Sequence, residues 1–291
     1  MRNYIISFVI FSTIVIPIII INQMDKQPSM QVVELKSEWQ FRQFGKNEWL
    51  KATVPGTVHT DLIANGKIED PFYRDNEQKQ IWIEGEDWEY RTLFDIDKEA
   101  FKRQNIDIIF KGLDTYADVF INDKLIKSTD NMFVAYTIPC KEFLKIGSNS
   151  LRILFHSPTN VGLKKLNESP YLVPAVNEFA PDDKRTSVFT RKAPYHYGWD
   201  WGPRIVTSGV WRPIYLQVWD VAKITTTYHE LKKLYSHEAD YETAVEIQAT
   251  DKGKGELEVL LNGEKVASEK DRKSTRLNSS HSTLSRMPSS A

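Results

Sequence analysis

The densest group of residues suited to contacting a sugar lies within positions 195–212, in the segment YHYGWDWGPRIVTSGVWR. Trp199 and Trp201 flank Asp200, with a glycine on either side of the three. An indole plane covers the apolar C–H face of a pyranose. A carboxylate accepts charge-assisted hydrogen bonds from its hydroxyls, and these are about twice as strong as neutral ones. These residue types predict a loop that contacts a saccharide.

The same residues also suit a purely structural role, because aromatic side chains dominate protein cores as well as binding sites. Trp199 and Trp201 are two positions apart, so on a regular strand they face one side and Asp200 faces the other. Gly198 and Gly202 favour an irregular backbone here. That irregularity favours a binding site over a plain strand, but residue types alone leave both interpretations open.

The segment resembles the motif near the end of the N-terminal domain of β-mannosidases of glycoside hydrolase family 2. The stretches VPGTVHTDL, PFYRDNE, DWEYR and KGLDTYADVFIND resemble parts of the same domain. The resemblance covers residues 34–220 strongly and residues 221–270 weakly. It implies a jelly-roll sugar-binding domain followed by an immunoglobulin-like domain.

The resemblance also implies roles for individual residues. Trp199 closes the wall of a sugar subsite, and Asp200 accepts hydrogen bonds from hydroxyls of a terminal mannosyl ring. The remaining residues of the motif that we single out are expected to hold the loop in shape; they are Trp201, Arg204 and Trp211.

The activity implied is that of an exo-acting, retaining β-mannosidase, which hydrolyses terminal β-D-mannose from an oligosaccharide or glycan. Neither a cofactor nor a metal ion is implied. Retaining glycosidases need two carboxylic groups about 5–5.5 Å apart, and in this family both are glutamates on a TIM barrel after the second sandwich. A barrel needs roughly 250 residues, so we expect it outside this chain. We therefore assign no catalytic residue here and expect no hydrolysis by this chain alone.

Two alternatives stay open. A free-standing carbohydrate-binding module or lectin would use the same loop for recognition only. A family 2 enzyme of another specificity would act on a glucuronide, galactoside or glucosaminide, although GWDWGPR resembles the mannosidase branch.

Other charged groups have simpler expected roles. His59 and Asp61 stand beside a Pro-Gly turn and are predicted to be a solvated pair rather than a general base and its partner. A solvated rim is predicted for the acidic cluster, which consists of Glu84, Glu86, Asp87 and Glu89.

Composition narrows the class of protein. Among 291 residues, 38 Lys and Arg balance 39 Asp and Glu, which gives no electrostatic case for nucleic acid or an anionic membrane surface. The hydrophobic fraction of 41% suits a globular chain with a large core. Cys140 is the single cysteine, so neither an intramolecular disulfide nor a cysteine-based metal site can form, and a buried inert thiol is expected.

The N-terminus predicts export. After the positive Arg2, an apolar run extends from Tyr4 to Ile21 and is followed by polar residues. Residues 1–25 are therefore predicted to be a signal peptide. An uncleaved N-terminal anchor is the alternative, because the run approaches the roughly 18 residues that can span a bilayer. The destination would be the periplasm, the exterior or a lysosome, depending on the source.

Period-two alternation and closely spaced turns predict an all-β chain. The clearest strands are residues 90–96 and 117–121, the second ending in an Asn-Asp turn. We predict a jelly-roll, galactose-binding-like β-sandwich over residues 32–219. Its residues 157–191 contain several prolines and few strand signals, so they are expected to form a long irregular loop that shapes a cleft.

Residues 220–270 are predicted to begin an immunoglobulin-like sandwich and to contain about half of its strands. Asn262-Gly263 is a hairpin signal within it. The tail, residues 271–291, begins DRKSTRLNSSH and breaks the strand rhythm. It looks like a translated sequencing adapter and is left out of the fold prediction; a basic, serine-rich disordered tail is the alternative.

Overall fold

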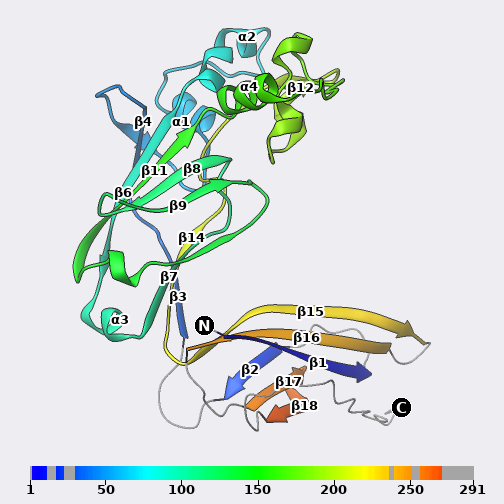
Figure 1. Cartoon of the computed structure of the whole chain (residues 1–291). Helices are drawn as coiled ribbons and strands as arrows, with labels where there is room; N and C mark the ends of the chain where they lie inside the picture. Colours follow the sequence, from blue (N-terminus) through cyan, green and yellow to red (C-terminus); the bar gives the residue numbers. More distant parts are fainter. Residues whose placement is uncertain (1, 12–17, 23–29, 236–238, 251–255, 271–291) are drawn as a thin grey trace. The chain divides into compact units, whose positions relative to one another are not determined.

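The structure of the chain is a computed structural model that describes residues 2–11, 18–22, 30–235, 239–250 and 256–270 (Figure 1). The chain divides into two compact units, one of residues 32–218 and one that joins residues 1–31 to residues 219–291. Both consist mainly of strands paired in antiparallel sheets. The prediction of an all-β chain is therefore confirmed.

The larger unit is built on a six-stranded and a four-stranded sheet. The six-stranded sheet has the order β5-β4-β6-β11-β8-β9, and the four-stranded sheet has the order β10-β7-β14-β3. The strands of the first are β4 (Trp39–Gln43), β5 (Leu50–Ala52), β6 (Trp88–Ile96), β8 (Tyr116–Ile121), β9 (Lys124–Asp130) and β11 (Gly147–His156). Those of the second are β3 (Met30–Glu34), β7 (Asn105–Phe110), β10 (Tyr136–Pro139) and β14 (Ile214–Trp219).

One hydrophobic core holds this unit together and draws side chains from both sheets. Alternate residues of the strands point inward, so that Phe41, Tyr90 and Phe155 are fully buried. The ring centroids lie 5.5 Å apart for Phe41 and Tyr90 and 5.7 Å apart for Tyr90 and Phe155. Cys140 is buried as predicted, and burial raises the pKa of its thiol to about 12.

Short helices connect the strands. They are α1 (Val58–Ala64), α2 (Asn76–Gln80), α3 (Lys98–Lys102) and α4 (Pro158–Glu168), with the 3-10 helices η1 (Ile81–Gly85), η2 (Lys141–Phe143), η3 (Asp182–Lys184), η4 (Ser187–Phe189) and η5 (Pro194–His196). A two-stranded hairpin, β12 (Tyr197–Trp199) with β13 (Gly202–Arg204), follows η5.

Helix α4 corrects the expectation that residues 157–191 are irregular throughout. The side chain of Ser157 caps this helix by accepting a hydrogen bond from the Asn160 amide, and Pro158 occupies its first turn. Proline is favoured at the first helical position because its missing N–H has no partner there. The sequence-based prediction was wrong because it took that proline as a breaker rather than as a helix start.

The smaller unit contains β1 (Arg2–Phe11), β2 (Ile18–Asn22), β15 (Ala222–Leu234), β16 (Ala239–Ala249), β17 (Glu256–Leu261) and β18 (Glu264–Lys270). They form two three-stranded sheets, β1-β16-β15 and β18-β17-β2. Asn262 and Gly263 have φ values of 52° and 87° and link β17 to β18. Positive φ at both turn residues is what the type I′ turn of a two-residue hairpin requires, so the hairpin predicted at this dipeptide is confirmed.

The apolar N-terminal run lies in the smaller unit, where β1 pairs with β16 and β2 pairs with β17. Among the described residues, no helix has the length and apolar character needed to cross a membrane. Export by a leader or an anchor stays a prediction. The tail, residues 271–291, lies outside the described residues.

The acidic cluster around positions 84–89 is not a solvated rim, which corrects that prediction. The Glu89 side chain is 3% exposed and accepts from Arg42 at 2.6 Å and from Arg152 at 3.0 Å. Asp87 accepts from the backbone N–H of Ser157 at 2.7 Å. These partners lie on distant segments, so nothing in the local sequence indicates them.

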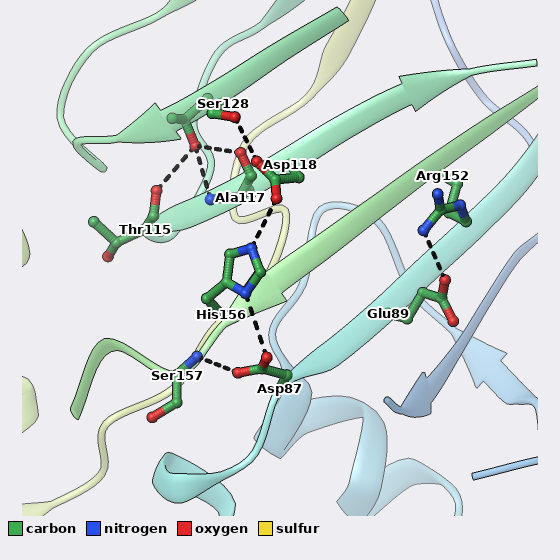
Figure 2. Close-up of polar contacts among 10 residues, drawn as sticks. Asp87, Glu89, Thr115, Ala117, Asp118, Ser128, Arg152, His156 and Ser157 are labelled. Carbon is green, nitrogen blue, oxygen red and sulfur yellow. Dashed lines mark hydrogen bonds and ion pairs between the residues drawn. The ribbon is translucent and has the colours of Figure 1, made fainter. Parts of the chain in front are cut away.

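His156 bridges two carboxylates on the outer face of the six-stranded sheet (Figure 2). Its Nδ1 lies 3.3 Å from Asp87 and its Nε2 lies 2.9 Å from Asp118. Both ring nitrogens can donate only in the imidazolium form. The hydrogen bond to Asp87 and then that to Asp118 raise the pKa of His156 to about 9, against the effect of burial.

We predict that this bridge stabilises the fold in a pH-dependent way. Because the folded pKa is above the unfolded value of about 6.5, the contribution is complete below about pH 6.5 and is lost as the pH rises through about 9. His156→Gln should therefore lower Tm at about pH 6 and change it little near pH 10. Thermal melts of both proteins at each pH measure this, and a loss of equal size at the two pH values would contradict it.

Candidate functional site

The hairpin of β12 and β13 presents the predicted sugar-contacting residues. Trp199 pairs with Gly202 across it, so Asp200 and Trp201 form its two-residue turn. Asp200 is exposed at the tip, Trp201 is 76% exposed and Trp199 is half-buried. The segment therefore forms a tight turn rather than one regular strand. This agrees with the irregular backbone that its two glycines favour.

Gly198 makes the close approach of the hairpin to its neighbour possible. Its φ is +85°, a region that favours glycine. A Cβ at this position would lie 2.7 Å from the Cβ of Phe179. The amide of Phe179 also donates to the carbonyl of Tyr197 at 3.1 Å. The hairpin therefore packs against the residue 179 segment through backbone as well as side chains.

A cavity of about 440 Å³ adjoins the hairpin tip. This volume lies within the range of small-molecule sites. Residues 199–204 of the hairpin line one part of it. The rest comes from two other segments, in the residues Pro71, Phe72, Arg74, Glu77, Gln78, Ile81 and Phe179. None of these residues was predicted to belong to the site, although the motif PFYRDNE marks the stretch that supplies four of them.

Arg204 ties the hairpin to two other segments. Its Nε donates to both oxygens of Glu84, at 3.1 and 2.9 Å, and its Nη2 donates to Oε1 of Glu84 at 2.9 Å. Its Nη1 donates to Glu178 at 3.0 Å and to the carbonyl of Tyr197 at 3.1 Å. The side chains of Arg204, Glu84 and Glu178 are 8%, 11% and 1% exposed. The structure thus gives Arg204 the contacts of a residue that holds the loop in shape.

Trp211 lies apart from the cavity at the hairpin tip and is not among the residues that line it. It packs against the chain at Gly112, where a Cβ would approach its Nε1 to 2.5 Å. The guanidinium of Arg212 stacks 4.1 Å from the centroid of its ring. The structure therefore brings Trp199, Asp200, Trp201 and Arg204 together and leaves Trp211 outside this group.

A buried ionic cluster includes residues from the segments directly before and after the hairpin. Lys192 donates to the Asp114 carboxylate and, at 2.8 Å, to the carbonyl of Thr207. The Nδ1 of His196 lies 3.9 Å from the same Asp114 carboxylate. Burial and then the charge of Lys192 lower the pKa of His59 and of His196 to about 4. Both imidazoles are therefore neutral at neutral pH, which sequence analysis did not foresee.

His59 and Asp61 are both buried, which corrects the prediction of a solvated pair. The Nδ1 of His59 is hydrogen-bonded to Thr207 at 2.9 Å. Asp61 accepts from the Thr53 amide and from the Tyr90 hydroxyl, both at 2.8 Å, and burial raises its pKa to about 6. The prediction was wrong because a capping box at Thr57 starts helix α1 directly after the turn and directs both side chains inward.

The family model of the glycosyl hydrolase 2 galactose-binding domain-like domain matches residues 39–212. The chain belongs to this family. The match contains the whole hairpin and the segments that contact it, and the fold predicted for this part of the chain is confirmed.

The chain is similar to curated β-mannosidases. It is 35% identical to Beta-mannosidase B of Emericella nidulans over 246 residues, which is 81% of this chain and 28% of that protein. It is 32% identical to Beta-mannosidase of Mus musculus over 194 residues, 65% of this chain and 22% of the mouse protein. The chain thus spans 28% of the length of the first of these relatives and 22% of the second.

A solved structure agrees with these sequence matches. The crystal structure of Beta-D-Mannosidase from Dictyoglomus thermophilum superposes with a TM-score of 0.68 at 33% identity, covering 82% of this chain and 29% of that one. The suspected family is therefore confirmed by sequence and by structure.

We predict that Arg204→Met destabilises the larger unit by about 3–5 kcal/mol, because it leaves Glu84 and Glu178 buried without their cation. The matched control is Arg212→Met, since Arg212 is exposed and gives up only its stacking on Trp211, which should cost no more than about 1 kcal/mol. Urea unfolding followed by tryptophan fluorescence measures both. Equal stability of the two variants would contradict the role of Arg204.

Proposed function

We propose that the chain is the N-terminal portion of an exo-acting, retaining β-mannosidase that hydrolyses terminal β-D-mannose from glycans. In this proposal the hairpin of residues 197–204 supplies one wall of the sugar subsite. The observation that carries it is the position of Trp199 and Asp200, which stand at a cavity of about 440 Å³. The identity of 35% to Beta-mannosidase B of Emericella nidulans supports the choice of sugar.

The environment of Asp200 suits the proposed contact. Its carboxylate is exposed, and within the described residues no side chain donates a hydrogen bond to it. Both oxygens are thus open to sugar hydroxyls, and such bonds are charge-assisted. The half-buried Trp199 offers an indole surface beside it, with its ring centroid 6.2 Å from that of Trp201. Together they offer one hydrogen-bonding and one apolar contact to a single ring.

The proposal gives this chain a binding role and leaves the bond cleavage to other residues. A retaining mechanism needs a carboxylic acid/base and a carboxylate nucleophile about 5–5.5 Å apart. We assign both to a TIM barrel of the same polypeptide, beyond this chain, and assign neither to a residue described here. The hairpin would position the ring so that its glycosidic bond meets that pair, which is how binding energy remote from the reacting atoms raises kcat/KM.

We predict that Asp200→Asn in the full-length product of the gene lowers kcat/KM for p-nitrophenyl β-mannoside by roughly a hundredfold or more, because a site built around a hydroxyl contact is left mispaired. The matched control is Asp183→Asn, which changes an exposed residue of η3 and should keep wild-type kinetics.

The outcomes separate the candidate functions. Unchanged kinetics of a folded Asp200→Asn enzyme would rule out the contact. A full-length protein that binds mannosyl glycans but does not hydrolyse them would instead be a carbohydrate-binding module. Faster turnover of a β-glucuronide, β-galactoside or β-glucosaminide than of the mannoside would identify that sugar as the substrate instead.

A further inference from the structure

The outer face of the six-stranded sheet carries a groove of about 1080 Å³ that the proposed function does not use. Its floor is formed by β4, β5, β6 and β11, whose inward side chains belong to the core. The groove is lined mainly by charged and amide side chains, among them Gln40, Arg42, Lys51, Arg91 and Arg152. Its volume is that of a ligand site rather than of a single ion.

Four of these side chains occupy one row across the sheet. Lys51 lies opposite Gln40, Gln40 lies opposite Arg91, and Arg91 lies opposite Arg152. Neighbouring strands are about 4.8 Å apart, so the row brings three cations within a span of about three strand spacings. On one sheet face, directly opposite residues interact most strongly.

The juxtaposition of Arg91 and Arg152 is unfavourable by itself, since like charges directly opposite one another destabilise a sheet. Glu89 offsets only part of it. This buried carboxylate accepts hydrogen bonds from Arg152 at 3.0 Å (Figure 2) and from Arg42 at 2.6 Å. One negative charge is therefore shared between two positive ones. Within the described residues, neither Arg91 nor Lys51 is bonded to a carboxylate.

The guanidinium of Arg91 is held in place without being neutralised. Its Nε and Nη2 donate to Oε1 of Gln40 at 3.0 and 2.9 Å. The guanidinium carbon of Arg91 stacks 3.7 Å from the ring centroid of Trp49, and that of Arg42 lies 4.3 Å from the same centroid. Arginine has five N–H donors, so the remaining ones stay available to an acceptor. Such a fixed guanidinium matches carboxylate and sulfate groups.

The acidic residues of the groove lie outside this row. Counting all that line it, four cations (Arg42, Lys51, Arg91 and Arg152) face three carboxylates (Glu38, Glu89 and Asp123). Glu38 precedes β4, and Asp123 lies in the turn between β8 and β9. The row is therefore positive, while Glu38 and Asp123 offer acceptors outside it, which suits a ligand that carries an anionic group and hydroxyls.

We propose that this groove binds an acidic saccharide, an oligosaccharide whose carboxylate or sulfate is held by Arg91 and Arg152 and whose hydroxyls meet Gln40 and the groove's carboxylates. Charge complementarity selects the anionic group, and the volume of the groove favours an oligosaccharide over a free anion. The proposal is independent of the role of the hairpin, because none of the residues on which it rests belongs to the hairpin or lines the cavity at its tip.

Titration of the full chain with tetragalacturonate, a heparin tetrasaccharide and mannotetraose tests the proposal. The readout is the indole N–H signal of Trp49 in NMR spectra, because this residue lines the groove and reports binding there. We expect one or both acidic probes to shift this signal, with affinity falling as salt increases. Binding of tetragalacturonate would show that carboxylates are sufficient, whereas binding of the heparin tetrasaccharide alone would show that sulfate is needed. Mannotetraose should leave the signal unchanged.

Arg91→Gln should weaken binding of the acidic probe about tenfold, the loss expected for one charge-assisted hydrogen bond. Lys51→Gln is a second variant at the same row and should weaken it in the same direction. Arg191→Gln removes an exposed arginine that pairs with Asp130 outside the groove, and it should change affinity by less than about twofold.

Three results would overturn the proposal. They are no shift of the Trp49 signal by either acidic probe, an equal shift by mannotetraose, and an equal loss of affinity in Arg91→Gln and Arg191→Gln.

Discussion

The site depends on a buried guanidinium. Arg204 sits between Glu84 and Glu178, with each of the three side chains at most 11% exposed. A charge removed from water to this extent is costly unless it is paired and hydrogen-bonded, so the arginine holds both carboxylates in place, and its loss would leave both buried without a cation. Because Arg204 belongs to the hairpin, Glu84 to η1 and Glu178 to the segment before η3, the pairing fixes three segments relative to one another. This arrangement therefore fixes the position of the hairpin tip, which contains Trp199 and Asp200.

The ionic clusters of the larger unit share this logic and differ in their consequences. Around Lys192 and Asp114, burial is complete enough that the neighbouring histidines are neutral. At His156 the two carboxylates outweigh burial and keep the imidazole charged. The difference follows from exposure and from neighbouring charge, since the His196 side chain is 15% exposed and lies near the Lys192 cation, whereas that of His156 is 35% exposed and is hydrogen-bonded to two carboxylates. A histidine near an acidic residue is therefore not by itself a sign of a raised pKa; burial and the neighbouring charges together decide it.

The features that the sequence predicted correctly are those that depend on residues close together in the chain. The alternation in β6 and β8 and the Asn262-Gly263 turn follow from strand geometry and backbone preference within a few residues. The predictions that were wrong concern charged residues whose partners are remote. Glu89 is 47 positions from Arg42, and Glu84 is 120 positions from Arg204. No spacing rule links such residues, so a run of acidic residues was taken for a solvated surface.

A sandwich domain fixes the positions of side chains but not their chemistry. In this one the inward residues of each strand are committed to the core, and the outward residues of the same strands are free to differ. On the outer face of β6, Glu89 is neutralised by two arginines, while Arg91, two residues further on, is stacked and hydrogen-bonded without losing its charge. If stability alone shaped this face, a carboxylate opposite Arg152 would serve better than a second arginine. Local rules that a sequence breaks without compensation tend to mark function, and that is the physical reason to look for a ligand there.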